Sequence, residues 1–112
     1  MHTLYISLGS NLGDRYTLLQ QAICLLGQRV GVVEQTSSFI ETEPWGFTSE
    51  HPFLNACVKL HTDLTPARCL RETQAIEREM GRTQKSTDGH YHDRPIDIDL
   101  LIYDHLHFDA FV

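Results

Sequence analysis

Two aspartates separated by one residue form the feature of this sequence with the clearest chemical meaning. Asp97 and Asp99 flank Ile98 within an otherwise apolar segment. In a β-strand, side chains at positions i and i+2 project from the same face, ~6–7 Å apart along the chain. Two adjacent carboxylates repel each other, and Mg²⁺ would offset that repulsion, because it takes oxygen ligands from one or two carboxylates and from substrate phosphates. The alternative is a solvated strand face.

Cationic and polar side chains that would suit a nucleotide polyphosphate occur near this pair. Arg82, Lys85 and Arg94 lie in or beside the polar segment that leads to the aspartates. Arginines can bind the phosphate oxygens that a metal leaves free, although ordinary loop solubility is the alternative. Gln74 and Glu77 lie three residues apart on a predicted helix, on a side away from its buried stripe. They could hydrogen-bond a nucleotide or form a solvated helix face.

Aromatic and amide side chains suggest a second kind of ligand. Trp45, Phe53 and Tyr91 are candidates to sandwich a flat heterocycle, while the amide of Asn55 would contact its polar edge. Stacking on aromatic rings combined with one placed amide is a common way to hold a base or a pterin. The alternatives are packing beneath a loop for Phe53 and surface exposure without a function for Trp45.

Residue periodicity predicts the elements that must position these side chains. Alternating patterns predict strands near residues 4–8, 30–42, 53–61 and 96–103, and helical spacing predicts helices from Asp14 to Gly27 and from Thr65 to Gly81. The order β-α-β-β-α-β is that of α+β, ferredoxin-like folds, in which an antiparallel sheet carries both helices on one face.

The same periodicity assigns side chains to the two faces of the sheet. In the last strand the helix-facing set would be Ile96, Ile98, Leu100 and Ile102, and the opposite set Asp97, Asp99, Leu101 and Tyr103. Phe53 and Asn55 alternate with apolar residues of the preceding strand in the same way. We therefore expect an aromatic ring, an amide and two carboxylates on the open face, and a site at that place.

Length and composition restrict the class of protein. The 112 residues fit one compact domain, which we assign to residues 1–112. The formal net charge of −6 argues against binding to nucleic acid or to an anionic membrane. No apolar run approaches the ~18 residues of a membrane span. The three cysteines lack C-x-x-C spacing, which favours a reducing compartment, so we expect a cytoplasmic protein. We also expect it to be a monomer.

Four blocks of residues resemble one protein family in order and spacing. They are Leu8-Gly9-Ser10-Asn11-Leu12-Gly13-Asp14, Ser37-Ser38 through Thr42-x-Pro44-x-Gly46, Phe53-Leu54-Asn55-Ala56, and Arg94-Pro95-Ile96-Asp97-Ile98-Asp99-Leu100-Leu101. Over nearly its whole length the chain is similar to the hydroxymethyl-dihydropterin pyrophosphokinases of folate biosynthesis. The resemblance implies attack of a pterin hydroxymethyl oxygen on the β-phosphorus of ATP, with release of AMP. Members of the family continue past the position of Val112, so we expect a C-terminally incomplete domain.

The resemblance also implies a role for each candidate residue. Asp97 and Asp99 would hold two Mg²⁺ ions and would form the catalytic set together with Arg82 and Arg94. The ATP site would be lined by Gln74, Glu77, Arg82, Lys85, Arg94 and Ile98. The pterin pocket would consist of Thr42, Pro44, Trp45, Gly46, Phe53, Asn55, Tyr91 and Asp97. Two rival hypotheses are an inactive fragment that still binds nucleotide or pterin, and a generic ferredoxin-like ligand-binding module.

Overall fold

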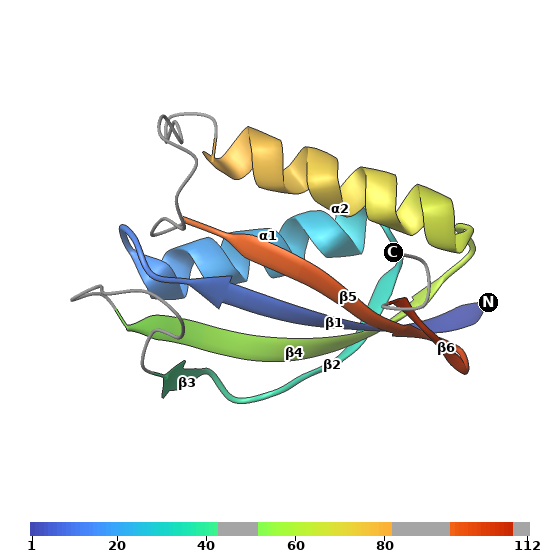
Figure 1. The fold of residues 1–112 in the computed structure, drawn as a ribbon, viewed down its shortest axis with the longest axis horizontal. Coiled ribbons are helices and arrows are strands. Elements are labelled where there is room, and N and C mark those ends of the chain that lie inside the picture. Colours follow the sequence, from blue (N-terminus) through green and yellow to red (C-terminus); the bar gives the residue numbers. More distant parts are fainter. Residues whose placement is uncertain (43–51, 82–94, 109–112) are drawn as a thin grey trace.

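The computed structural model describes residues 1–42, 52–81 and 95–108, and Figure 1 shows their arrangement. The elements are β1 (His2–Ser10), α1 (Arg15–Arg29), β2 (Val32–Thr36), β3 (Ile40–Thr42), β4 (Phe53–Thr62), α2 (Pro66–Gly81), β5 (Asp97–Tyr103) and β6 (Leu106–His107). The strands form an antiparallel sheet in the order β2-β4-β1-β5-β6, and β3 also pairs with β4. Both helices cover one face of this sheet (Figure 1), which confirms the predicted α+β fold.

Strand β1 lies at the centre of the sheet, between β4 and β5. Its residues Leu4, Ile6 and Leu8 are buried on the helix-covered face. They belong to one apolar cluster with the buried residues of the two helices, which are Leu19, Ala22, Leu26, Cys69 and Ile76. A strand period of two and a helix period of 3.6 thus place one apolar stripe from each element in the same core. The intervening residues of β1 project from the uncovered face.

Both helices begin directly after the residues predicted to start them, Asp14 and Thr65, whose side chains cap the helices. A carboxylate oxygen of Asp14 accepts a hydrogen bond from the backbone N–H of Thr17 at 3.2 Å. The hydroxyl of Thr65 accepts one from the backbone N–H of Arg68 at 3.2 Å. Each side chain satisfies an amide that has no partner within the first helical turn. Helix α2 extends to Gly81, the last described residue of this segment. Within the described ranges no helix has the length and apolarity needed to span a membrane.

The predicted end of α1 at Gly27 is wrong, because the helix continues to Arg29. Tertiary packing offsets the cost of a helical glycine, which is only ~1 kcal/mol. The turn occurs instead at Gly31, whose N–H donates to the carbonyl of Leu26 at 3.1 Å. A Cβ atom at Gly31 would lie 2.1 Å from the carbonyl oxygen of His61, so the approach of this turn to β4 requires glycine.

The single strand predicted from Val30 to Thr42 is also wrong, since the structure divides this segment into β2 and β3. The ladder with β4 shifts register between Val33 and Gln35. Beyond it, the backbone N–H of Cys57 donates to the hydroxyl of Ser37 at 2.8 Å instead of to a backbone carbonyl. A serine side chain therefore replaces a ladder partner and interrupts the strand.

The face assignment for β5 is correct up to Leu100 and wrong beyond it. The register with β1 shifts so that Ile6 pairs with Leu100 and Tyr5 with Ile102, which leaves Leu101 as an extra residue. Such a β-bulge reverses the alternation of side chains. Tyr103 therefore enters the core with 5% of its surface exposed. The short strand β6 that follows was not predicted.

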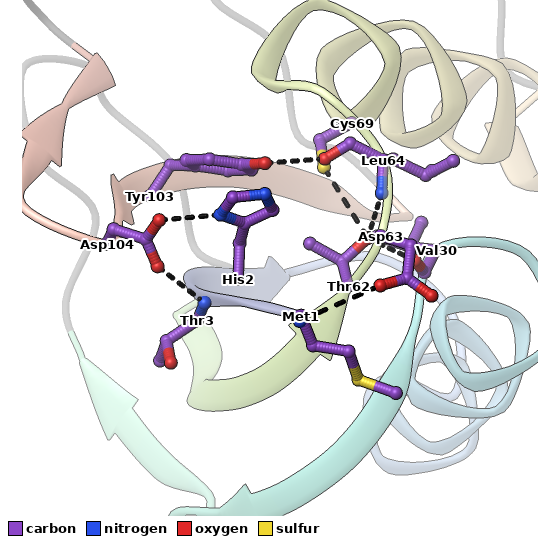
Figure 2. A network of polar contacts seen from close by, with 10 residues as sticks. All are labelled: Met1, His2, Thr3, Val30, Thr62, Asp63, Leu64, Cys69, Tyr103 and Asp104. Carbon is purple, nitrogen blue, oxygen red and sulfur yellow. Dashed lines mark hydrogen bonds and ion pairs between the residues drawn. The ribbon is translucent and has the colours of Figure 1, made fainter.

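A network of hydrogen bonds lies at the end of the sheet where β1 begins (Figure 2). The buried hydroxyl of Thr62 donates to the carbonyl of Val30 at 2.6 Å and accepts from the backbone N–H of Leu64 at 3.1 Å. The hydroxyl of Tyr103 donates to the carbonyl of Leu64 at 2.7 Å. Side-chain hydroxyls thus satisfy backbone groups where α1, β4 and β5 end or turn.

Asp104 joins the same end of the molecule to the N-terminal residues (Figure 2). Its carboxylate accepts from the backbone N–H of Thr3 at 2.9 Å and pairs with the His2 ring at 2.7 Å. The hydrogen bond from Thr3, followed by that from His2, lowers the pKa of Asp104 below its ordinary value of 3.8. Asp104 has a φ of 55°, a left-handed conformation that aspartate tolerates better than most residues.

Candidate functional site

The strand register gathers the predicted side chains on the uncovered face of the sheet, at the end of β1. Asn55 of β4 and Asp97 of β5 both pair with Gly9 of β1, so the three positions form one row. Ser7 pairs with Asp99 in the next row. Directly paired residues of an antiparallel sheet project from the same face. The amide and the two carboxylates therefore share one surface, with Asn55 and Asp97 two strand spacings, or ~10 Å, apart.

Gly9 leaves the middle of this row without a side chain. A Cβ atom there would lie 3.1 Å from the amide oxygen of Asn55 and 3.3 Å from the ring of Phe53. The ring and the amide oxygen consequently lie against the backbone of β1. Sequence reasoning assigned Gly9 no role in the site. A glycine inside a strand pattern, which often marks close approach of another group, was the available signal.

The amide of Asn55 has a fixed orientation. Its Nδ2 donates to the hydroxyl of Thr42 at 2.6 Å and to the carbonyl of Ile40 at 3.4 Å. Both partners belong to β3, which pairs with β4 at this point. Because the donor end of the amide is engaged, its oxygen is directed toward Gly9. Thr42, Phe53 and Asn55, which the sequence assigned to one pocket, are thus brought together.

Glu77 places a third carboxylate beside the two aspartates. Its Oε2 accepts a hydrogen bond from the backbone N–H of Ile98 at 2.6 Å. Burial raises the pKa of Glu77 to about 7; the bond from Ile98 opposes this rise, and the negative charges of Asp97 and Asp99 add to it. The prediction that Glu77 lies away from the buried side of its helix is therefore wrong.

The remaining predicted ATP-site residues on described elements differ in exposure. Gln74 is exposed on α2, as expected. Ile98 retains only 6% of its surface, and its N–H is bonded to Glu77. A nucleotide contact at Ile98 would consequently involve its main chain rather than its side chain.

The two aspartates fit Mg²⁺ that arrives with a polyphosphate. Asp97 is half-buried and Asp99 is exposed, and both offer hard oxygen donors on the same face. Among the described residues, no three His, Cys, Asp or Glu side chains form a group that could hold a metal by itself. Mg²⁺ needs only one or two protein carboxylates when substrate phosphates and water complete its shell. The donor set therefore suits a metal shared with a ligand rather than a closed structural site.

Other candidate residues lie outside the part of the chain that the structure describes. These are Pro44, Trp45, Gly46, Arg82, Lys85, Tyr91 and Arg94. A separate hollow of about 250 Å³ lies where α1 begins and α2 ends, and it includes none of the predicted site residues. It is lined by Leu12, Gly13, Asp14, Thr17, Leu18, Met80 and Pro95.

Comparison with known proteins gives a consistent result. The family model described as 7,8-dihydro-6-hydroxymethylpterin-pyrophosphokinase (HPPK) matches residues 5–110. A 2-amino-4-hydroxy-6-hydroxymethyldihydropteridine pyrophosphokinase of Porphyromonas gingivalis is 61% identical over 103 residues, which cover 92% of this chain and 70% of the relative. A protein of the same name from Bacillus subtilis is 45% identical over 100 residues, covering 88% of this chain and 58% of the relative.

A solved structure supports the fold independently. The crystal structure of an HPPK-DHPS in complex with substrates superposes with a TM-score of 0.71 at 17% sequence identity. The match covers 92% of this chain and 28% of that chain. At this level of identity the likeness concerns the fold, whereas the sequence matches concern the family.

Proposed function

This chain belongs to the 7,8-dihydro-6-hydroxymethylpterin-pyrophosphokinase family, and from that premise we propose that it transfers pyrophosphate from ATP to 6-hydroxymethyl-7,8-dihydropterin in folate biosynthesis. The pterin hydroxymethyl oxygen forms a bond to the β-phosphorus, the bond between that phosphorus and the α-phosphate oxygen breaks, and AMP leaves. The observation that best supports this proposal is the row formed by Asn55, Gly9 and Asp97. An amide that could bind a heterocycle and a carboxylate that could hold a phosphate-bound metal thus share one surface.

We assign the pterin to the β3–β4 side of this row. The Phe53 ring offers a stacking surface for a flat heterocycle. The oxygen of Asn55, held in place by Thr42, can accept a hydrogen bond from the polar edge of the pterin. Gly9 lets the Phe53 ring and the Asn55 oxygen lie close to the backbone of β1. These contacts would direct the hydroxymethyl group along the row toward Asp97.

We assign the ATP phosphates to the β5 side. Asp97 and Asp99 would hold Mg²⁺, with two ions as the expected number, and bound Mg²⁺ supplies neutralisation of phosphate charge. Asp97 shares its row with Asn55, whereas Asp99 lies one row farther along the strand. Asp97 is therefore the carboxylate closer to the incoming alcohol. The main contribution of the protein would be to hold the alcohol and the phosphate in reacting geometry.

Neutral variants of the two aspartates test this proposal. We expect Asp97→Asn and Asp99→Asn each to reduce Mg²⁺-dependent AMP formation by about a hundredfold or more. Both variants should remain folded, because each change removes like-charge repulsion. The matched control is Asp63→Asn, since Asp63 has 79% of its side chain exposed and pairs with the terminal amine of Met1 at 3.9 Å. Undiminished turnover in either site variant would contradict the metal assignment.

We further infer a monomeric cytoplasmic enzyme that binds small molecules. The cysteines Cys24, Cys57 and Cys69 are all free thiols, which suits a reducing compartment. The net charge of −6 disfavours binding to nucleic acid or to an anionic membrane. Sedimentation analysis at micromolar concentration would test the monomer, and a dimer that persists on dilution would contradict it.

A further inference from the structure

The edge of β5 beside the two aspartates is covered by a helix side chain. Strand β6 pairs with β5 at Ile102 and Tyr103, and no other described strand extends that pairing toward Asp97. The amide of Ile98, which lies between the aspartates in sequence, donates instead to Glu77 of α2 at 2.6 Å. One carboxylate therefore takes the place of a neighbouring strand at this point.

A carboxylate is a costly group to use at this position. Glu77 is half-buried and lies near two residues of the same charge. Removing a carboxylate from water and placing it beside others is unfavourable unless a donor compensates. The Ile98 amide is such a donor, and an apolar residue at position 77 would leave it without this partner.

The helix that carries Glu77 is firmly anchored. Ile76, the preceding residue, is completely buried in the core, and Thr73 on the same side of α2 is 1% exposed. The Glu77 carboxylate therefore extends from a rigid base to the backbone of β5. Glu77 also forms a side-chain hydrogen bond with Asp97, so it contacts the aspartate segment both directly and through the main chain at Ile98.

We propose that Glu77 is a positioning residue: by holding the Ile98 amide, it fixes the direction of β5 and hence the relative placement of the Asp97 and Asp99 carboxylates. The inference rests on the proposed function for the role of the aspartates, and it adds a residue that acts on them through the main chain. Groups that orient metal ligands in this way commonly contribute 10- to 100-fold to metal affinity.

Three substitutions separate the hydrogen bond from the charge. Glu77→Gln retains an acceptor oxygen at the same reach and removes the charge. Glu77→Ala removes both, so the comparison of Gln with Ala measures the hydrogen bonding of this side chain apart from its charge, and exchange of the Ile98 amide reports the bond to the backbone. Glu77→Asp retains the charge but is shorter by one methylene, which withdraws the carboxylate from the Ile98 amide. Glu79→Ala is the matched control on α2, because Glu79 pairs with Arg29 instead.

The experiment measures Mg²⁺ affinity by calorimetry with α,β-methylene-ATP present, hydrogen exchange of the Ile98 amide by NMR, and AMP formation. We expect Glu77→Ala to weaken Mg²⁺ binding about 10-fold or more and to accelerate Ile98 exchange. Glu77→Asp should behave like Glu77→Ala. The Mg²⁺ affinity of Glu77→Gln should stay within about threefold of that of the original chain. The affinity of the control Glu79→Ala should equal that of the original chain.

The inference would be overturned if Glu77→Gln were impaired as strongly as Glu77→Ala, or if Glu77→Ala were unchanged. If Glu77→Ala does not fold, the Mg²⁺ affinities of Glu77→Gln and Glu77→Asp are compared instead. A higher affinity for Glu77→Asp than for Glu77→Gln would contradict the positioning role. An original chain that binds Mg²⁺ with the analogue but forms no AMP would refute the proposed function while leaving the positioning role measurable. An original chain that binds no Mg²⁺ would refute the positioning role.

Discussion

At the scale of single residues, Glu77 makes stability depend on pH. Burial first, and then the charges of Asp97 and Asp99, raise its pKa from 4.5 to about 7 against the hydrogen bond from Ile98. A raised pKa means that the folded state binds the proton more tightly than the unfolded chain does. The stabilisation is therefore complete below pH 4.5 and is lost as the pH rises through about 7.

We expect this loss to be visible in the metal-free protein. With allowance for solvent screening of a half-exposed group, it amounts to the order of 1–2 kcal/mol. Urea denaturation of the original chain and of Glu77→Gln, at several values between pH 4.5 and about 7, measures the difference between them. The original chain should lose stability relative to the variant across this interval. A difference that is constant with pH would contradict the raised pKa.

Sequence reasoning identified some site residues and missed others for physical reasons. The spacing of Asp97 and Asp99 on a strand was sufficient to place both on one face with Asn55, because strand alternation is a local property. Sequence reasoning missed Gly9 and assigned Glu77 to the wrong side of its helix, because both depend on neighbours distant in sequence. Gly9 lies against the ring of Phe53, and Glu77 accepts a hydrogen bond from the amide of Ile98.

At the scale of elements, two glycines near the end of α1 should respond oppositely to alanine. A Cβ atom at Gly31 would lie 2.1 Å from a backbone carbonyl of β4, whereas at Gly27 it would meet only the side chain of Val33 at 3.7 Å. We expect Gly31→Ala to lower the free energy of unfolding by ~1–3 kcal/mol or more. Gly27→Ala should raise it by up to ~1 kcal/mol, because alanine is the better helix former.

Chemical denaturation of both variants checks this pair. If both variants changed the free energy of unfolding by the same amount and in the same direction, the close approach of Gly31 to β4 would not explain why this position is glycine. Circular dichroism of Gly27→Ala serves as the control, since its helix content should not fall.

Element types were predictable here, whereas element ends and irregularities were not. The caps Asp14 and Thr65 and the apolar stripes of both helices are local signals, and the structure confirms them. The break after β2 depends on the hydroxyl of Ser37, and the reversal in β5 depends on the bulge at Leu101. Both result from pairing with strands distant in sequence, which periodicity within one segment does not encode.

At the scale of the whole molecule, Asp104 connects the two ends of the described chain. It binds Thr3 and His2, and it has a φ of 55°. We expect melting temperatures to decrease in the order Asp104→Asn, Asp104→Gly, Asp104→Ala. Asparagine retains the acceptor and tolerates the left-handed backbone, glycine retains only the backbone freedom, and alanine retains neither.

The pH dependence of this link has the opposite sign to that of Glu77. The pKa of Asp104 is lowered, chiefly by the hydrogen bond from Thr3, so its stabilisation is present above 3.8 and is lost as the pH falls below that value. Thermal unfolding of the original chain and of the Asp104 variants, at several pH values, measures both the order of melting temperatures and the loss of stability at low pH. An alanine variant that melts with the original chain would contradict the link, and AMP formation at low temperature serves as the control.

The fold itself followed from the order of elements, since the sheet order β2-β4-β1-β5 is the one expected for a split β-α-β arrangement. Fold alone does not determine function, because this architecture carries many activities. The assignment instead depends on family membership together with the row that joins Asn55, Gly9 and Asp97. The reaction assigned to that row is therefore the claim to test first.

The most direct test is to identify the products. The 112-residue chain is incubated with Mg²⁺, ATP and 6-hydroxymethyl-7,8-dihydropterin, and nucleotides and pterins are separated. Pyrophosphoryl transfer predicts AMP and pterin diphosphate in equal amounts, with no ADP and no reaction when the pterin is omitted. Formation of ADP with a pterin monophosphate, or binding of both substrates without any AMP, would contradict the proposed function.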